Sequence, residues 1–334
     1  MQTVKEANVS GKRVIVRCDF DDPIKDRKLV DDTRIRSNLP TLKYLLDKGS
    51  SLFLISKLGR PKGRDPNLSL RIVMDALSQH LGEKINFKED LRQERLDKVT
   101  LLENLRFWPE EEAADLEFSK ILASFGDLYV NECFATSHRG DASFIGIPKY
   151  LPSFAGLNLI REITQLKKLL VDPERPLIAI IGGAKLETKL PAINNLAKVS
   201  DKVLVAGKLM FEVAGQSLPT NIIVAPDYLD KKDIGPKSVE IFTRIIQTAR
   251  TIVWNGPLGV FEEEKYLDGT RRVGEAVAAS SAYKIIGGGD TIAALKKLGL
   301  LDKIDYVSTG GGAMLEFLAG KKLPGLVALG YYND

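Results

Sequence analysis

Short apolar runs alternate with amphipathic stretches along almost the whole chain, and this alternation constrains the fold more than any other feature. Runs of strand length lie at Val14–Arg17, Ser51–Ser56, Val99–Asn104, Asp127–Phe134, Leu177–Gly183, Lys202–Gly207, Asn221–Pro226, Thr251–Gly256, Tyr283–Gly289 and Asp305–Gly312. Stretches of helical periodicity follow several of them, at 33–49, 70–82, 115–126 and 186–196. The pattern predicts an α/β fold built on parallel sheets covered by helices.

A chain of 334 residues is too long for one comfortable core, so we expect two domains. A helical stretch at 156–170 precedes the sequence DPERP (Asp172–Pro176), which ends that helix and begins the next sheet. We therefore predict two doubly wound, Rossmann-like parallel-sheet domains, 1–160 and 161–316, joined by a helical hinge.

The net charge of +4 and the two widely separated cysteines restrict the class of protein. The basic excess is modest, and the sequence has no lysine block with interleaved aromatic residues that would require a nucleic-acid partner. No apolar run reaches the length of a membrane span, and the first residues lack a secretory apolar core. We expect a cytoplasmic protein with buried, reduced Cys18 and Cys133 and with neither a nucleic-acid nor a membrane partner.

Glycines cluster after four strand-like runs of the second half, in IIGGAK, VWNGPLGVFE, IIGGGD and STGGGA. Glycine lets the backbone approach a ligand closely, and the following helix offers free N–H groups, which suits phosphate. The alternative is that these glycines only form tight turns. Neither GxxxxGK[ST] nor GxGxxG occurs, so the pattern indicates a phosphate or nucleotide domain of another kind.

Charged side chains accompany these loops. Lys185 and Lys189 lie four residues apart at a predicted helix start, where they can clamp phosphates or simply face solvent. Asp290 and Thr291 follow the sequence GGG. A carboxylate and a hydroxyl there suit a Mg²⁺ ion that carries nucleotide phosphates, although Asp290 also fits a helix N-cap.

Single arginines lie at or near strand ends of the first half. They are Arg34, Arg60, Arg106 and Arg139. Each alone is an ordinary surface charge, but together they would converge on one face of a parallel sheet and form an anion pocket. One domain for an anion and one for a nucleotide is an arrangement typical of phosphoryl transfer.

The stretch RCDFDDPI (Arg17–Ile24) places three carboxylates at a strand end. Its spacing does not fit an EF-hand calcium loop, because Pro23 takes the place of the third acid. The acids could grip a substrate or simply face water in a turn, and we expect Asp22 to face water.

The chain resembles the phosphoglycerate kinase family over nearly its whole length. Matching stretches occur in the family's order: RCDFDDPI, DDTRIRSNLPTLKYLL, LGRPKG, LLENLRF, NECFATSHR, IPKYLPSFAG, IGGAKLETK, DIGPKSVEIF, VWNGPLGVFE, IIGGGDT and STGGGAMLEFLAGKKLPG. The resemblance implies a glycolytic transferase that moves phosphate reversibly from 1,3-bisphosphoglycerate to ADP, giving 3-phosphoglycerate and ATP. It also implies Mg²⁺ with ADP/ATP, in-line transfer after domain closure, a monomer, and a C-terminal segment, 317–334, that returns to the N-terminal domain.

The resemblance further implies roles for the matching residues in the substrate domain. Asp19 would accept a hydrogen bond from the substrate hydroxyl, and Arg34 would steady the moving phosphoryl group. The non-transferred phosphate would be held by Arg60, Arg106 and Arg139.

In the nucleotide domain, Lys185 would steady the moving group and Lys189 would contact nucleotide phosphate. Asp290 would hold the metal–nucleotide, with Thr291 beside it. Backbone N–H groups for developing charge would come from Gly288, Gly289, Gly310 and Gly311. The nucleoside site would be lined by Gly183, Gly207, Gly235, Asn255, Pro257, Val260 and Glu262.

The substrate domain departs from the family pattern at three positions. Asp21 replaces an asparagine, Lys57 replaces a histidine, and Asp141 stands where the family commonly has a histidine. We predict that Asp21 and Lys57 both face substrate and pair their charges. Asp141 either orients Arg139 or lies in a turn.

The nucleotide domain departs from the pattern by a deletion. The family normally carries an insert of several dozen residues where this chain has only AGQSLPT (214–220). Because the insert helps to cover the adenine, we expect altered base selectivity.

Two other hypotheses stay open beside an active phosphoglycerate kinase. One is a nucleotide-binding homologue with weak activity, against which the retention of Arg34, Lys185 and Asp290 argues. The other is a kinase for a related acyl phosphate, which the changes at Asp21, Lys57 and Asp141 favour.

Overall fold

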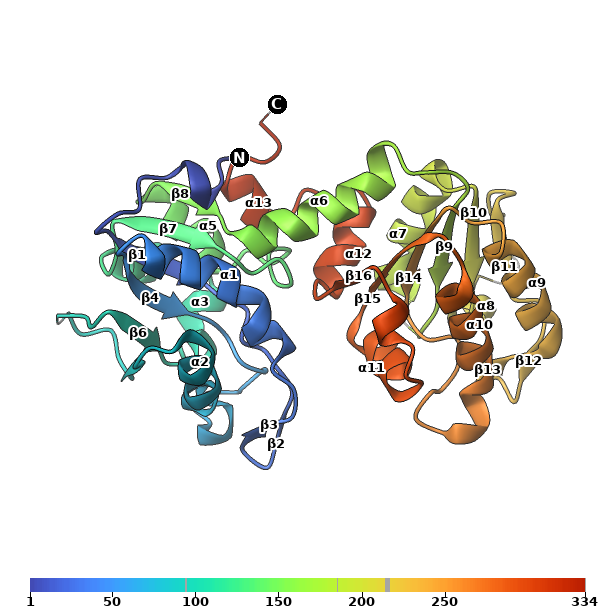
Figure 1. Ribbon diagram of the computed structural model, residues 1–334, viewed down its shortest axis with the longest axis horizontal. Helices are drawn as coiled ribbons and strands as arrows, with labels where there is room; N and C mark the ends of the chain where they lie inside the picture. The colour runs from blue at the N-terminus through green and yellow to red at the C-terminus, as the bar shows by residue number, and fades with distance from the viewer. Residues whose placement is uncertain (94, 185, 214–216, 334) are drawn as a thin grey trace. The chain divides into compact units, whose positions relative to one another are not determined.

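The protein consists of two compact units, each built around its own sheet (Figure 1). The computed structural model describes residues 1–93, 95–184, 186–213 and 217–333, so Lys185 and part of the 214–220 connection lie outside the described residues. One unit comprises Met1–Glu162 and Lys322–Asp334, and the other comprises Ile163–Lys321.

The first unit contains a six-stranded, all-parallel sheet in the order β5-β6-β4-β1-β7-β8. Its strands are β1 (Arg13–Arg17), β4 (Ser51–Ile55), β5 (Asn86–Lys88), β6 (Val99–Leu102), β7 (Leu128–Asn131) and β8 (Ser153–Ala155). A small hairpin, β2 (Ile24–Lys25) with β3 (Lys28–Leu29), stands apart from the sheet. Residues 14–17 of β1 are buried throughout, as expected for a strand covered on both faces.

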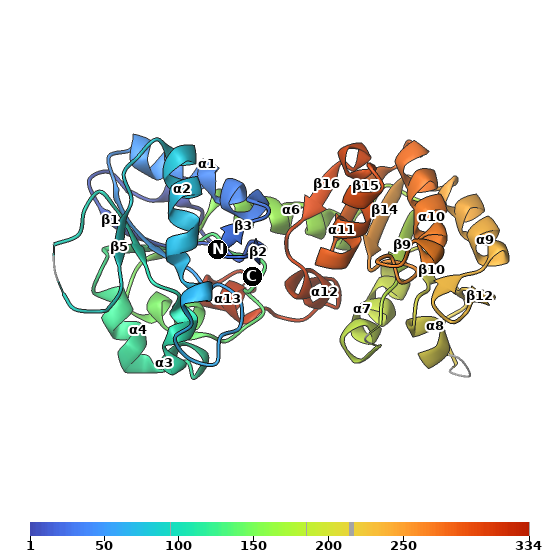
Figure 2. The same ribbon diagram turned by 90° about the horizontal axis from the view of Figure 1, so that it is seen from below.

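Helices cover both faces of this sheet (Figure 2). They are α1 (Thr33–Asp47), α2 (Met74–Leu81), α3 (Pro109–Glu112), α4 (Leu116–Ala123), α5 (Ala142–Ile145) and α13 (Pro324–Ala328). Helices α1 and α2 pack together, while α3, α4 and α13 pack against α5. The C-terminal helix α13 is tied to the unit by the Gly325 N–H, which donates to Ser137 O at 2.9 Å.

The second unit has a parallel sheet of the same size, in the order β11-β10-β9-β14-β15-β16. Its strands are β9 (Leu177–Ile181), β10 (Lys202–Val205), β11 (Ile222–Val224), β14 (Thr251–Asn255), β15 (Tyr283–Gly287) and β16 (Tyr306–Ser308). The strand order reverses between β9 and β14. Ligands of doubly wound sheets bind at such a switch point, beyond the carboxyl ends of the strands.

The helices of the second unit also lie on both faces of its sheet (Figure 2). They are α7 (Leu186–Val199), α8 (Leu209–Glu212), α9 (Pro236–Ile246), α10 (Asp268–Ala279), α11 (Gly289–Lys297) and α12 (Gly312–Leu318). Helices α7 and α12 are neighbours, and α9 and α11 each contact α10. A hairpin of β12 (Tyr228–Leu229) and β13 (Asp233–Ile234) completes the unit.

The predicted fold class is confirmed, since both sheets are parallel and wound on both sides. Strands β5 and β8 were not predicted, because their three residues, NFK and SFA, do not form an apolar run. Helix α6 (Leu157–Val171) lies where the connecting helix was expected. Cys18 and Cys133 are buried free thiols, as predicted. Among the described residues, no helix combines the length and the apolar character needed to cross a membrane.

Helix α6 begins on a buried carboxylate. Glu132 accepts hydrogen bonds from the Thr41 hydroxyl at 2.7 Å and from the Asn158 N–H at 3.1 Å. A Cβ atom on Gly156 would lie 1.7 Å from the Glu132 carboxylate, so only glycine allows this close approach. Burial raises the pKa of Glu132 to about 8, because the hydrogen bonds only partly offset the lost solvation.

We predict that Glu132 makes the protein less stable as the pH rises. Its folded-state pKa lies above the unfolded value, so the folded protein binds more protons between pH 4.5 and 8. Stability from this group is therefore present at low pH and is lost as the pH rises through that window, by up to about 5 kcal/mol. Chemical denaturation from pH 5 to pH 9 should show a steeper loss for the native protein than for Glu132→Gln.

The exposed residue Glu117 supplies the matched control. Glu117→Gln should keep the native pH dependence. Parallel stability curves for Glu132→Gln and the native protein would contradict the assignment.

Candidate functional site

The first carboxylate after strand β1 is paired with an arginine. Asp19 is buried and forms an ion pair with Arg34, from the first turn of α1. Asn38, one helical turn further along α1, fixes the backbone of Asp19: it accepts from the Asp19 N–H at 3.1 Å and donates to the Asp19 carbonyl at 2.9 Å. The negative charge of Asp19 raises the pKa of the Arg34 guanidinium.

The second carboxylate, Asp21, is paired with Lys57, which follows strand β4. The charge pairing predicted for these two residues is therefore present. Asp21 also accepts a hydrogen bond from the Gly59 N–H at 2.6 Å. Burial raises the pKa of Asp21, but the Lys57 ammonium and the Gly59 N–H outweigh burial and hold that pKa below its usual value.

The third carboxylate, Asp22, does not face water, so this expectation was wrong. Asp22 is only 4% exposed and accepts hydrogen bonds from the N–H groups of Arg34 and Ile35, both at 2.9 Å. It thereby satisfies free donors at the start of α1, as a capping carboxylate does. Burial raises the pKa of Asp22 to about 6.

Asp141 has a different partner from the one considered. Its carboxylate accepts a hydrogen bond from Arg106 Nη2 at 2.8 Å, and both side chains are buried. Among the described residues no hydrogen bond or ion pair joins Asp141 to Arg139, so the hypothesis that Asp141 orients Arg139 gains no support here. Asp141 does not lie in a turn either: it is the extended residue directly before α5, and its carboxylate is buried in the ion pair with Arg106.

The sheet order explains why these side chains share one edge. Strands β6, β4, β1 and β7 are consecutive neighbours, and all are parallel. Of the predicted substrate residues, Asp19 and Asp21 follow β1, Lys57 and Arg60 follow β4, Arg106 follows β6, and Arg139 follows β7. The ion pairs among these side chains form two groups. One group contains Asp19, Asp21, Arg34 and Lys57, and the other contains Arg106, Arg139, Asp141 and Glu112.

The second unit contains a pocket of about 360 Å³ at the switch point of its sheet. Loops after β9, β10 and β14 line it, together with the start of α11 and the β12–β13 hairpin. The volume lies in the range of small-molecule sites. The lining residues are Gly183, Ala184, Gly207, Lys208, Met210, Phe211, Lys231, Lys232, Asp233, Pro257, Leu258, Gly259, Val260, Phe261, Glu262 and Asp290.

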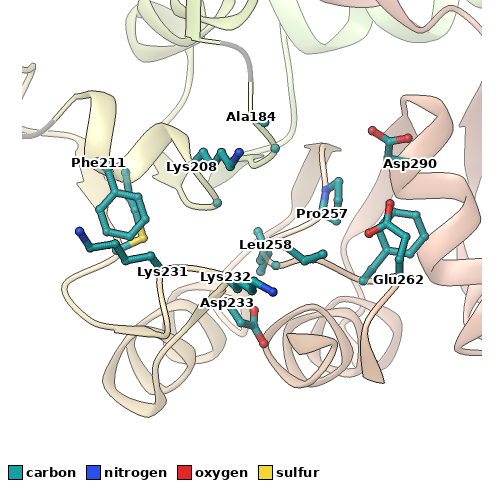
Figure 3. Close-up of a pocket in the computed structure, with 16 residues that line it drawn as sticks. Ala184, Lys208, Phe211, Lys231, Lys232, Asp233, Pro257, Leu258, Glu262 and Asp290 are labelled. Atoms are coloured by element: carbon teal, nitrogen blue, oxygen red, sulfur yellow. The ribbon is translucent and has the colours of Figure 1, made fainter. Parts of the chain in front are cut away.

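The pocket has two different ends (Figure 3). Asp290 and Glu262 lie on one side, Phe211 and Lys231 lie on the opposite side, and Pro257 is between them. The Phe211 ring makes an edge contact with Tyr228, with ring centroids 4.9 Å apart. The N–H groups of a helix start suit the phosphates of a nucleotide, and the carboxylates beside it suit a cation bound to those phosphates. The aromatic end suits the base.

Six of the predicted nucleotide residues line this pocket. They are Gly183, Gly207, Pro257, Val260, Glu262 and Asp290. Gly235 does not line it: a Cβ atom there would lie 2.4 Å from the Asp227 carboxylate, so glycine is needed for packing. Asn255 is buried, and its amide donates to Gly287 O at 3.0 Å, which ties β14 to β15.

Thr291 also has a structural role. Its buried hydroxyl accepts from the Gly256 N–H at 2.7 Å and donates to Gly287 O at 3.0 Å, so it holds the β14 and β15 loops together. Lys189 lies behind the same loops, where its ammonium donates to the carbonyls of Gly182 and Asn255. Burial lowers the pKa of Lys189 to about 8, although Asp290 acts in the opposite direction.

The glycines of the loops divide into two kinds. A Cβ atom on Gly207 would lie 2.7 Å from the backbone of Gly183, so packing between loops requires glycine there. A Cβ atom on Gly289 or Gly311 would meet nothing within 4 Å. The positive φ angle of 50° at Gly311 already favours glycine there, whereas Gly289 has no such conformational reason and would be explained by a ligand lying close to the backbone.

The residues of the aromatic end were not predicted as site residues. Lys231 and Lys232 belong to the tight β12–β13 hairpin, where Asp230 and Lys231 have positive φ angles. Asp233 has a buried carboxylate that accepts from the Gly269 N–H at 2.8 Å and anchors this hairpin to α10. The turn-like sequence DKKD is the only signal, and it does not show that the turn faces a pocket.

Comparisons with known proteins agree with this architecture. The family model described as phosphoglycerate kinase matches residues 4–217 and 213–321. The chain is 41% identical to a phosphoglycerate kinase of Dictyoglomus turgidum, covering 98% of this chain and 97% of the relative. It is 39% identical to a cytosolic phosphoglycerate kinase of Triticum aestivum, over 98% and 97%. A solved phosphoglycerate kinase structure from Coxiella burnetii superposes with a TM-score of 0.86 at 32% identity, covering 99% of both chains.

The alignments also show the deletion. The match to the Dictyoglomus turgidum protein spans 385 positions, more than the 334 residues of this chain, so at least 51 positions have no counterpart here. The two family matches meet at 213–217, where the sequence predicts the shortened connection. On these grounds, the chain belongs to the phosphoglycerate kinase family.

Proposed function

We propose that this chain transfers a phosphoryl group reversibly from 1,3-bisphosphoglycerate to ADP, with 3-phosphoglycerate and ATP as products. The observation that carries this assignment is the group of cations at the carboxyl edge of the first sheet. Arg34 and Lys57 are held beside Asp19 and Asp21, and Arg106 is held by Asp141. A substrate with one carboxylate and one phosphate needs several cations at separate points, and this edge provides them.

In the first unit, Asp19 accepts the hydrogen bond of the substrate hydroxyl, and Arg34 beside it steadies the moving phosphoryl group. Arg106 and Arg139 bind the non-transferred phosphate, together with the exposed Arg60. Lys57 contributes a charge that Asp21 balances, so the substrate meets a nearly neutral pair there.

In the second unit, the pocket holds the nucleotide with its phosphates toward Asp290. This carboxylate is exposed in the first turn of α11, and hard oxygen ligands of this kind suit Mg²⁺ bound to phosphates. Bound Mg²⁺ would neutralise phosphate charge during transfer. Lys189 and the N–H groups after Gly288 and Gly311 bind the phosphates and the charge that develops on them.

Several expectations stay predictions. They are the role of Lys185, closure of the two domains, the monomeric state, the cytoplasmic location and the absence of a nucleic-acid partner. The aromatic end of the pocket is compatible with weakened adenine selectivity, because the family's covering insert is missing.

A kinase for a related acyl phosphate is the second candidate. It is favoured by the carboxylates of Asp21 and Asp141, which balance Lys57 and Arg106 and so reduce the positive charge available to the substrate.

We predict turnover of 3-phosphoglycerate with MgATP in a coupled assay. Asp290→Asn should lower kcat/KM at least about tenfold, because a ligand of the metal–nucleotide is lost. Turnover only with a different carboxylate would favour the second candidate. Nucleotide binding without any turnover would point to a weak homologue.

The Asp21–Lys57 pair predicts a strongly coupled double-mutant cycle. Asp21→Asn alone leaves the buried Lys57 ammonium without its carboxylate and should cost about 3 kcal/mol of folding free energy. Asp21→Asn with Lys57→His, the family's residues, should recover most of it. Denaturation curves of the three variants, including Lys57→His alone, measure this coupling.

The same variants test how the Asp21–Lys57 pair affects the KM for 3-phosphoglycerate. Asp21→Asn alone should not lower the KM for 3-phosphoglycerate. A lower KM with unchanged turnover would show that the pair is not needed to hold Lys57.

The lowered pKa of Lys189 predicts that the protein takes up protons when a nucleotide binds. Its folded-state pKa of about 8 means that the ammonium loses its proton as the pH rises through 8. Nearby phosphate raises this pKa again, so ATP binding at pH 8.5 should take up about half a proton or more. Calorimetric titrations in two buffers of different ionisation enthalpy measure the uptake.

Lys189→Arg is the control, because arginine stays charged at this pH. Its proton uptake should be close to zero. Equal uptake by the native protein and Lys189→Arg would exclude Lys189 as the source.

A further inference from the structure

Glu112 lies between two arginines proposed to bind the distal phosphate. Its Oε1 is 3.3 Å from Arg106 Nη1 and 3.8 Å from Arg139 Nη1. The same oxygen therefore faces both guanidinium groups. The Glu112 side chain is 62% exposed, so solvent reaches this contact.

The two arginines keep hydrogen-bonding capacity that Glu112 does not satisfy. Arg106 Nη1 and Arg139 Nε are buried atoms without a hydrogen-bond partner in the part of the chain that the structure describes. The approach of Glu112 to Arg106 is close enough for an ion pair but lacks hydrogen-bond geometry. Unsatisfied buried donors are costly, and a tetrahedral phosphate could engage more of them than this one oxygen does.

The surrounding structure holds the two partners of this contact in place. On one side, Asp141 binds Arg106 Nη2 at 2.8 Å, which leaves Nη1 toward Glu112. On the other side, the preceding residue, Glu111, is fully buried and accepts from the Ser143 N–H at 2.9 Å and from its hydroxyl at 2.6 Å. Helix α3 is thus fixed, and only the Glu112 side chain needs to rotate for the contact to open.

We infer that Glu112 occupies the place of the substrate's distal phosphate between Arg106 and Arg139 and is displaced when that phosphate binds. This inference rests on the proposed function for its choice of ligand. In the free protein the carboxylate partly balances the two arginines. On binding, the phosphate takes over these contacts and Glu112 turns into solvent. Glu112 therefore lowers the affinity for the phosphorylated substrate.

The test is Glu112→Gln, which keeps the size of the side chain and removes its charge. The KM for 3-phosphoglycerate should fall about two- to fivefold at low ionic strength, the range expected for one exposed ion-pair partner. The inhibition constant of inorganic phosphate should fall in parallel. Both differences should shrink at 0.5 M salt, because the contact is exposed and screened.

Glu110→Gln is the matched control. Glu110 lies on the same short helix and is exposed, and removing its charge should leave KM and phosphate affinity at native values. Melting curves of both variants establish that they are folded.

An unchanged or higher KM for Glu112→Gln, with unchanged phosphate affinity, would overturn the inference. A native protein that does not turn over 3-phosphoglycerate would instead overturn the proposed function. In that case calorimetric binding of inorganic phosphate still decides the role of Glu112: tighter binding by Glu112→Gln supports it, and equal binding refutes it.

Discussion

The substrate side of this protein depends on pairing buried cations with carboxylates at the carboxyl edge of one parallel sheet. Lys57 and Arg106 are almost completely buried, and each would carry an unacceptable desolvation cost without Asp21 or Asp141. The pairs allow positive charge to stay close to the core, on rigid strand ends. They also mean that a bound anion meets cations that already have a carboxylate partner.

The shape of the nucleotide pocket depends on close packing between backbone loops rather than on ion pairs. Loops after β9, β10 and β14 touch one another through glycines such as Gly183 and Gly207, and this close packing sets the floor of the pocket. Lys189 is half-buried behind that floor with a lowered pKa, and its ammonium is held there by the carbonyls of Gly182 and Asn255. The two units thus use different physical means to prepare for anionic ligands.

The sequence predicts the architecture well, because buried parallel strands leave long apolar runs such as Leu177–Ile181. It also predicts which strand ends bear charge, and the pairing of Asp21 with Lys57. It does not predict that Asp22 caps α1 or that Asp141 binds Arg106, because both contacts join residues from different elements whose distance the sequence does not encode. The hairpin lysines, Lys231 and Lys232, were missed for the same reason.

The central claim is that Lys57 and Arg106 keep their partners Asp21 and Asp141 when the substrate binds. Only the Glu112 carboxylate is displaced. A crystal structure of the full chain with 3-phosphoglycerate tests this most directly. The account predicts the phosphate on Arg106 and Arg139, Glu112 turned away, and the Asp21–Lys57 pair still formed. A phosphate bound elsewhere, or a Lys57 that has left Asp21 to bind the ligand, would contradict it.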